Sequence, residues 1–202
     1  MELQIETHHL FILVDFKTAY DEVNRNQLCK AMQELGIPQK LVRLTQATME
    51  GTTAKVNIHN ELSVNFHIGK GLRQGDALAC SLFNIALEKI ILEANINQRG
   101  NIFYKSVQIL AYADDIDIIS RSPKSLQEAT TALDRAARMM GLEINQNKTN
   151  YMICGTKKKY AENVFKVKHQ TFEQVDSFVY LGTFIFFLMA LQHILGLYFA
   201  AL

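Results

Sequence analysis

The chain has 202 residues, of which 49% are hydrophobic and 20% charged, so it is long and apolar enough to fold around a core. Its 21 basic and 20 acidic residues leave a net charge of +1, and this lack of a basic excess counts against a protein that binds nucleic acid unaided. Three scattered cysteines without C-x-x-C spacing argue against a disulfide framework or a zinc site. The first residues do not resemble a secretory signal. We therefore expect an intracellular protein, in the nucleus or the cytoplasm.

The first elements are a strand followed by two helices. Residues 10–14 are an unbroken apolar run that ends in Asp15, which predicts a buried strand with a carboxylate at its C-terminal end. Apolar residues at helical spacing predict a helix that is capped by Asn26 and ends at Gly36. Residues 38–51 predict a second helix, because a proline opens it.

A hairpin and a long helix come next. Apolar and polar residues alternate over 54–58 and again over 62–68, with Asn60 and Glu61 between the two runs, which predicts a β-hairpin. Residues 77–95 carry a wide apolar face at helical spacing, which predicts a helix.

An acidic turn lies between the next two predicted strands. Apolar residues dominate 107–112 and 116–120, and the segment 113–115, which contains two aspartates, interrupts them. Ser122 is then a candidate cap for a helix that Gly141 ends.

Two shorter strand candidates, 142–145 and 150–154, complete this series. The order of elements is a strand, helices, a hairpin, a helix, a strand pair, a helix and a strand. We therefore expect an α+β fold in which an antiparallel sheet carries helices on one face.

The acidic residues are the candidates for chemistry. Asp15 ends a buried strand, and Asp114 with Asp115 lies between two others, so a sheet that places these strands side by side brings three carboxylates together. Like charges at close range repel one another unless a cation neutralises them, and oxygen ligands select Mg²⁺ or Mn²⁺. An isolated Asp-Asp pair is most often a solvated turn, so the spacing alone leaves both interpretations open.

Five segments in order resemble the catalytic motifs of non-LTR retrotransposon reverse transcriptases. They are FILVDFKTAYD at 11–21, GLRQGDALACSLFNIAL at 71–87, YADD at 112–115, the segment 147–149 and YLG at 180–182. GLRQGD followed by LFN is the most specific of them, and YLG alone is weak.

The resemblance implies a polymerase palm over residues 1–183. It implies that Asp15, Asp114 and Asp115 hold two Mg²⁺ or Mn²⁺ ions that serve nucleotidyl transfer. The implied partners are an RNA template with a DNA primer, and deoxynucleoside triphosphates.

The resemblance also implies a nucleotide site. The backbone of Phe16 would lie near the triphosphate, and the ring of Tyr20 would exclude a sugar 2′-hydroxyl. Gln74 and Gly75 would contact the incoming nucleotide, and Arg73 the template or a phosphate. In isolation, Tyr20 also fits a core tyrosine, and Gln74 and Arg73 fit a solvated loop.

Two further motifs concern the leaving group and the primer. Lys148 would protonate the departing pyrophosphate, although the residue alone equally fits an exposed lysine at a strand end. Tyr180, Leu181 and Gly182 would contact the primer. Asp117 shares a strand face with Asp115, and we expect it to support the site from behind or to lie at the surface.

The chain departs from the family pattern at both ends. The first motif begins about ten residues from Met1, so we expect the fingers region of the family to be absent, and we expect no thumb after the last motif. Instead, residues 184–202 form an apolar tail, which fits either a membrane helix or a rearranged gene end. Two hypotheses stay open: an RNA-directed DNA polymerase that needs fingers and thumb from a longer product, and a non-catalytic remnant.

Overall fold

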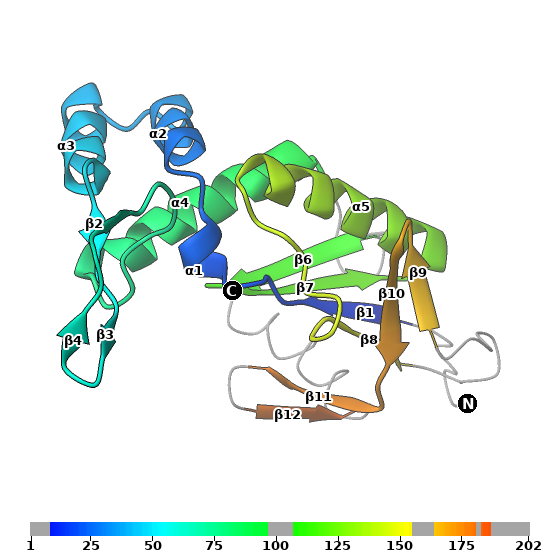
Figure 1. Ribbon diagram of the computed structural model, residues 1–202. Helices are drawn as coiled ribbons and strands as arrows, with labels where there is room; N and C mark the ends of the chain where they lie inside the picture. Colours follow the sequence, from blue (N-terminus) through cyan, green and yellow to red (C-terminus); the bar gives the residue numbers. More distant parts are fainter. Residues whose placement is uncertain (1–8, 97–106, 155–163, 181–182, 187–202) are drawn as a thin grey trace, which may run out of the picture. The chain divides into compact units, whose positions relative to one another are not determined.

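Figure 1 shows the computed structural model of the chain, which describes residues 9–96, 107–154, 164–180 and 183–186. Contacts divide the chain into two compact units. The sheet unit comprises Met1–Phe16, Ala94–Arg135 and Ile144–Leu202, and the helical unit comprises Lys17–Glu93 and Ala136–Glu143. All three aspartates that are predicted to act together belong to the sheet unit.

The sheet unit is built on six strands in the order β6-β7-β1-β8-β10-β9. Their bounds are Val107–Tyr112 for β6, Asp115–Ser120 for β7, His9–Val14 for β1, Asn150–Cys154 for β8, Gln170–Gln174 for β10 and Val164–Val167 for β9. Neighbours in this order are antiparallel except β8 and β10, which run parallel. The α+β class is therefore confirmed, with a sheet that is mixed at this one pair.

One face of the sheet is covered by the helix α5, Pro123–Met139 (Figure 1). Ile12 of β1 lies opposite Ile118 of β7, and both side chains are fully buried, as is Leu126 of α5. Burying a large aliphatic side chain contributes ~1.5–3 kcal/mol. The apolar run at residues 10–14, which predicted a buried strand, is thus covered by α5 on one face of the sheet.

The opposite face carries a second apolar cluster. Phe11, Ile119 and Met152 pack there with Phe178 of β11, a strand that spans Ser177–Tyr180. Because side chains alternate between the two faces of a strand, both faces of β1 are buried.

The apolar tail begins in a strand. β11 pairs antiparallel with β12, Thr183–Phe186, so residues 184–186 extend a small sheet, whereas residues 187–202 lie outside the described part of the chain. Within the described ranges, no helix is both long and apolar enough to cross a membrane.

The helical unit contains α1 at Ala19–Glu22, α2 at Arg25–Glu34, α3 at Gln39–Met49, all but the last residue of α4 at Ala77–Ala94, and the last turn of α5. The predicted cap of α2 is wrong by two residues, because Asn24 caps the helix and Asn26 already lies within it. The side chain of Asn24 accepts hydrogen bonds from the backbone N–H groups of Asn26 and Gln27, at 3.0 and 3.1 Å.

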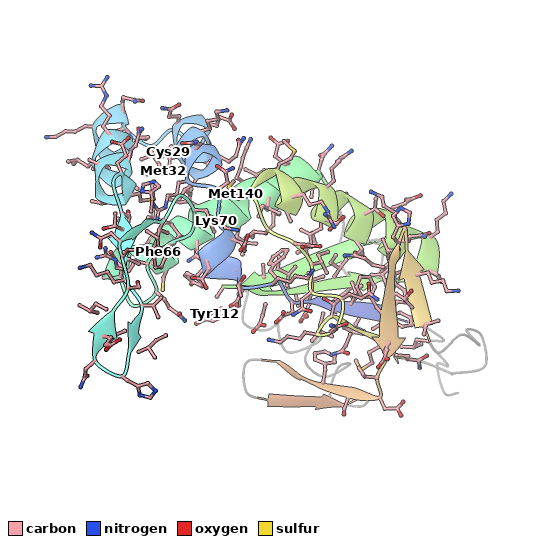
Figure 2. The ribbon with its side chains drawn as sticks, in the orientation of Figure 1. Cys29, Met32, Phe66, Lys70, Tyr112 and Met140 are labelled. Atoms are coloured by element: carbon pink, nitrogen blue, oxygen red, sulfur yellow. The ribbon has the colours of Figure 1, made fainter. Side chains whose placement is uncertain are left out.

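The predicted hairpin consists of two short ladders. β2 (Thr53–Ala54) pairs with β5 (Phe66–His67), and β3 (Asn57–Ile58) pairs with β4 (Glu61–Leu62). The turn lies at residues 59–60, one position earlier than predicted, and both of its residues have positive φ, as a type I′ turn requires. Its alternating apolar residues do not bury a face, since Phe66, labelled in Figure 2, is 46% exposed.

The predicted start of α5 and the predicted strand at 142–145 can be compared with the structure in the same way. Ser122 caps α5 as predicted, because its side-chain oxygen accepts a hydrogen bond from the N–H of Ser125 at 3.1 Å. The predicted strand 142–145 is wrong, since only Ile144 pairs there, in an isolated bridge with Phe16. A single bridge cannot propagate a ladder, so the rest of that segment stays irregular.

Candidate active site

The turn between β6 and β7 presents the acidic pair. Tyr112 lies opposite Asp115, which leaves Ala113 and Asp114 as a two-residue turn. Ala113 has a φ of 52°, and Asp114 is not among the residues with positive φ, as in a type II′ turn, where glycine is the usual first residue. This tight turn exposes the carboxylate of Asp114, beside Tyr112, which is labelled in Figure 2.

The position of β1 in the sheet brings Asp15 to the same turn. β1 pairs with β7 up to Val14 and Ile116, so Asp15 follows opposite Asp115 by continuation of that register. The pKa of Asp115 is raised, first by its partial burial and then by the negative charges of Asp114 and Asp15. Asp15, Asp114 and Asp115 therefore gather at one end of the central strands β1 and β7, and we call these three residues the acidic cluster.

Asp117 lies deeper on the same strand. It is 5% exposed, so it is not a surface group, and it lies opposite Leu13. Burial, with a smaller contribution from the charge of Asp115, raises its pKa to about 7. The only sequence pattern that bears on this burial is the alternation along β7, which places Asp117 on the same face as Asp115.

The carboxylate oxygens of the acidic cluster, and of Asp117 behind it, are of the kind that binds a hard cation. Oδ1 of Asp15 and Oδ1 of Asp117 are buried and have no hydrogen-bond partner in the described part of the chain. A buried carboxylate oxygen without a donor is costly, and an ion would compensate it. Among the described residues, however, no group of three or more His, Cys, Asp or Glu side chains is arranged to hold a metal ion. The acidic residues converge without forming a closed ligand set.

The segment before β8 supports Asp15. The backbone N–H of Asp15 donates a hydrogen bond to Oγ1 of Thr149, and its backbone C=O accepts one from the N–H of Asn145, at 3.2 and 2.8 Å. Lys148 lies on this segment and is exposed. The contact of Thr149 was missed by sequence reasoning, because it depends on where β1 ends beside β8.

The predicted nucleotide residues other than Phe16 lie in the helical unit. Tyr20 lies on α1, and its backbone C=O accepts a hydrogen bond from the N–H of Leu72 at 2.7 Å. Arg73, Gln74 and Gly75 follow directly and are exposed. The structure thus joins Tyr20 to the loop that carries the other three residues. Phe16, in the sheet unit, has a buried side chain, which agrees with a role for its backbone only.

The ring of Tyr20 is fixed from one side. It stacks on Phe83 of α4 with the ring centroids 4.6 Å apart and the planes 16° from parallel. Its hydroxyl donates to Sγ of Cys80 at 3.8 Å.

A cavity of about 250 Å³ lies beside this loop within the helical unit. Its lining includes Arg25, Thr52, Gly71 and Arg73. Nε of Arg25 donates to the C=O of Gly71 at 2.8 Å, and burial, followed by the charge of Arg73, lowers the pKa of Arg25. The loop is therefore tied to α2 through a partly buried guanidinium.

The predicted primer residues are described only in part. The backbone of Tyr180 ends β11, while its side chain and residues 181–182 lie outside the described part of the chain. Their contact with a primer stays a prediction.

Comparison with known proteins decides the family. Residues 2–185 match the family described as reverse transcriptase (RNA-dependent DNA polymerase). The chain belongs to the reverse transcriptase family. The match includes residues of both units and all five motifs, so the resemblance of the motifs to reverse transcriptases is confirmed.

Curated relatives of this reverse transcriptase chain come from retrotransposons. It is 24% identical over 183 residues to the Pol polyprotein of the type-1 retrotransposable element R2 from Popillia japonica, which covers 86% of this chain and 26% of that protein. It is 25% identical over 138 residues to the Pol polyprotein of the type-2 element R2DM from Drosophila melanogaster, covering 67% of this chain and 13% of that protein. The chain therefore spans about a quarter or less of these relatives.

Solved structures show the same fold. Apo telomerase from Candida tropicalis matches 89% of this reverse transcriptase chain and 31% of its own chain, with a TM-score of 0.66 and 14% sequence identity. A form of that telomerase truncated from its C-terminal domain matches 82% of this chain and 34% of its own, with a TM-score of 0.62 and 16% identity. The palm-like fold expected from the sequence is thereby confirmed.

Proposed function

We propose that this chain is the palm of an RNA-directed DNA polymerase, which transfers deoxynucleotides to the 3′-hydroxyl of a primer. The observation that carries the proposal is the gathering of Asp15, Asp114 and Asp115 at one end of β1 and β7, in a chain of the reverse transcriptase family. The proposed partners are an RNA template with a DNA primer, and deoxynucleoside triphosphates.

The acidic cluster would hold two Mg²⁺ or Mn²⁺ ions. When bound, such ions lower the charge repulsion at the site, activate the attacking hydroxyl and stabilise the leaving oxygen of an in-line phosphoryl transfer. The support for this assignment is the all-oxygen donor set, the exposed carboxylates of Asp114 and Asp115, and the unpartnered buried Oδ1 of Asp15.

The remaining residues would bind and orient the substrate. The ring of Tyr20, backed by Phe83, would occupy the space of a ribose 2′-hydroxyl and so favour deoxynucleotides. Gln74 offers an amide donor and acceptor to the nucleotide, and Lys148 would donate a proton from Nζ to the departing pyrophosphate. Phe16, Arg73 and Gly75 would contact the triphosphate or the template, and the segment 180–182 the primer.

Polymerisation would need the regions that flank the palm in a longer product. The curated relatives extend well beyond the matched part, and positioning of primer and triphosphate demands contacts on several sides. We therefore expect the 202-residue chain by itself to give no primer extension.

Metal binding by the chain tests the assignment of the acidic cluster. An ion that binds only the native state stabilises it, so millimolar Mg²⁺ or Mn²⁺ should raise the thermal midpoint. Asp114→Asn should abolish the rise, whereas Glu128→Gln, which removes an equal charge from the exposed side of α5, should keep it. No metal-dependent rise in the unmutated chain would favour the non-catalytic remnant.

A further inference from the structure

The backbone of Asp15 lies just beyond the ladder of its own strand. β1 pairs with β8 only as far as Leu13 and Asn150, and β1 itself ends at Val14. The peptide groups of Asp15 therefore need partners outside this ladder, because a partly buried N–H or C=O without one is costly.

One short segment supplies both partners. Oγ1 of Thr149 accepts the hydrogen bond from the N–H of Asp15 at 3.2 Å, and the N–H of Asn145 donates to the C=O of Asp15 at 2.8 Å. Thr149 is 2% exposed, so this hydroxyl is shielded from competing water. Both peptide groups of Asp15 are thus bonded to the segment 145–149.

The segment is itself folded around Asn145. The backbone C=O of Asn145 accepts hydrogen bonds from the N–H groups of Lys148 and Thr149, at 3.1 and 2.9 Å. Its side-chain Oδ1 accepts another from the N–H of Asn147 at 3.2 Å. These local bonds restrict the positions of Lys148 and Thr149 relative to Asp15.

The support acts on the backbone of Asp15 and not on its Oδ1 atom. Both hydrogen bonds involve the peptide groups of Asp15, whereas its Oδ1 has no partner among the described residues. A side-chain donor on Oδ1 would compete with a cation, while a bond to the N–H fixes the Cα position without that competition.

We propose that Thr149 is a positioning residue. It fixes the backbone of Asp15 for metal binding and holds that backbone at a constant position relative to Lys148. This inference rests on the proposed function of Asp15, but the hydrogen bond on which it depends can be measured without any activity. A purely structural role, in which Thr149 only fills space at the start of β8, would depend on its volume and not on its hydroxyl.

Three variants separate these roles. Thr149→Val keeps the branched shape and loses the acceptor, and Thr149→Ser keeps the acceptor and loses a methyl group. Thr130→Val is the matched control, because Thr130 is fully buried but its hydroxyl donates a hydrogen bond to the C=O of Leu126 within α5.

The first readout is hydrogen exchange of the Asp15 amide in the full chain, with the amide of Ile12 as an internal reference. We expect Asp15 to be protected in the unmutated chain and in Thr149→Ser, and to exchange roughly tenfold faster in Thr149→Val, the effect of losing about one hydrogen bond. Thr130→Val should leave the ratio unchanged. An unprotected Asp15 amide in the unmutated chain, or equal ratios in Thr149→Val and the unmutated chain, would overturn the proposal.

The second readout is steady-state primer extension by the chain joined to fingers and thumb regions of the family. Thr149→Val should lower kcat roughly tenfold, since small misplacements of reacting groups are costly, with the KM for deoxynucleotide changed less than about twofold. Thr149→Ser should restore most of kcat. Asp114→Ala in the same protein should remove extension, and activity that survives this substitution contradicts the proposed function. If Asp114→Ala is inactive but Thr149→Val has a normal kcat, only the inference about Thr149 is contradicted.

Discussion

Tyr20 of α1 stacks on Phe83 of α4 with a centroid separation of 4.6 Å, and Phe83 is fully buried. Phe83 therefore forms a rigid backing for the ring that we assign to sugar discrimination. Its support is independent of the acidic cluster, so discrimination and catalysis can be altered separately.

Phe83→Leu should weaken discrimination against ribonucleotides in a protein restored with fingers and thumb. Leucine keeps most of the buried volume but loses the stack, worth ~0.5–1.5 kcal/mol, so the Tyr20 ring gains freedom. The ratio of kcat/KM for deoxynucleotide over ribonucleotide checks this, and Tyr20→Ala should lower that ratio further. If Phe83→Leu matches the unmutated ratio while Tyr20→Ala lowers it, the stack has no role in discrimination.

Gly71→Ala should destabilise the chain more than Gly75→Ala. Both glycines have positive φ, 81° and 86°, so both substitutions incur backbone strain of roughly 1–2 kcal/mol. A Cβ on Gly71 would lie 2.5 Å from the backbone oxygen of Asp21, however, while one on Gly75 meets nothing within 4 Å. Urea unfolding should show the larger loss for Gly71→Ala, and equal losses would contradict the close approach of this loop to α1.

Arg25→Lys should also lower stability. Nη1 of Arg25 donates to the C=O groups of Met49 and Ile68, at 2.6 and 2.9 Å, and Nε donates to that of Gly71. A lysine ammonium cannot reproduce this planar fork, so these partly buried hydrogen bonds are lost, at about 0.5–1.5 kcal/mol each. The thermal midpoint should fall by several degrees, whereas Arg43→Lys on the exposed side of α3 should leave it unchanged; similar midpoints for both variants would count against the role of Arg25.

The acidic cluster could be predicted from the sequence because the patterns that indicate it lie directly beside the aspartates. The apolar runs that end at Asp15 and flank Asp114 specify strands, and the five motifs specify the family. The cap of α5 by Ser122 could also be predicted from the sequence. The choice between Asn24 and Asn26 as the cap of α2 required the exact start of that helix.

Long-range pairing accounts for most of what the sequence could not predict. The parallel pairing of β10 with β8 depends on how the chain crosses the sheet, which no local pattern encodes. The hydrogen bond between Thr149 and Asp15 joins residues 134 positions apart, and it exists only because β1 ends beside the start of β8. The burial of Asp117 likewise depends on what covers that face of the sheet.

Extension of a primed RNA template, by the chain joined to fingers and thumb regions of the family, tests the central assignment most directly. We expect no extension by the isolated chain, and Mg²⁺- or Mn²⁺-dependent incorporation of deoxynucleotides by the joined protein. Asp15→Asn and Asp114→Asn should each remove that incorporation, because each substitution takes away a carboxylate charge that holds the ions. Glu128→Gln should leave it intact. Incorporation that persists in Asp15→Asn or Asp114→Asn would contradict the assignment of these carboxylates as the metal-binding catalytic groups.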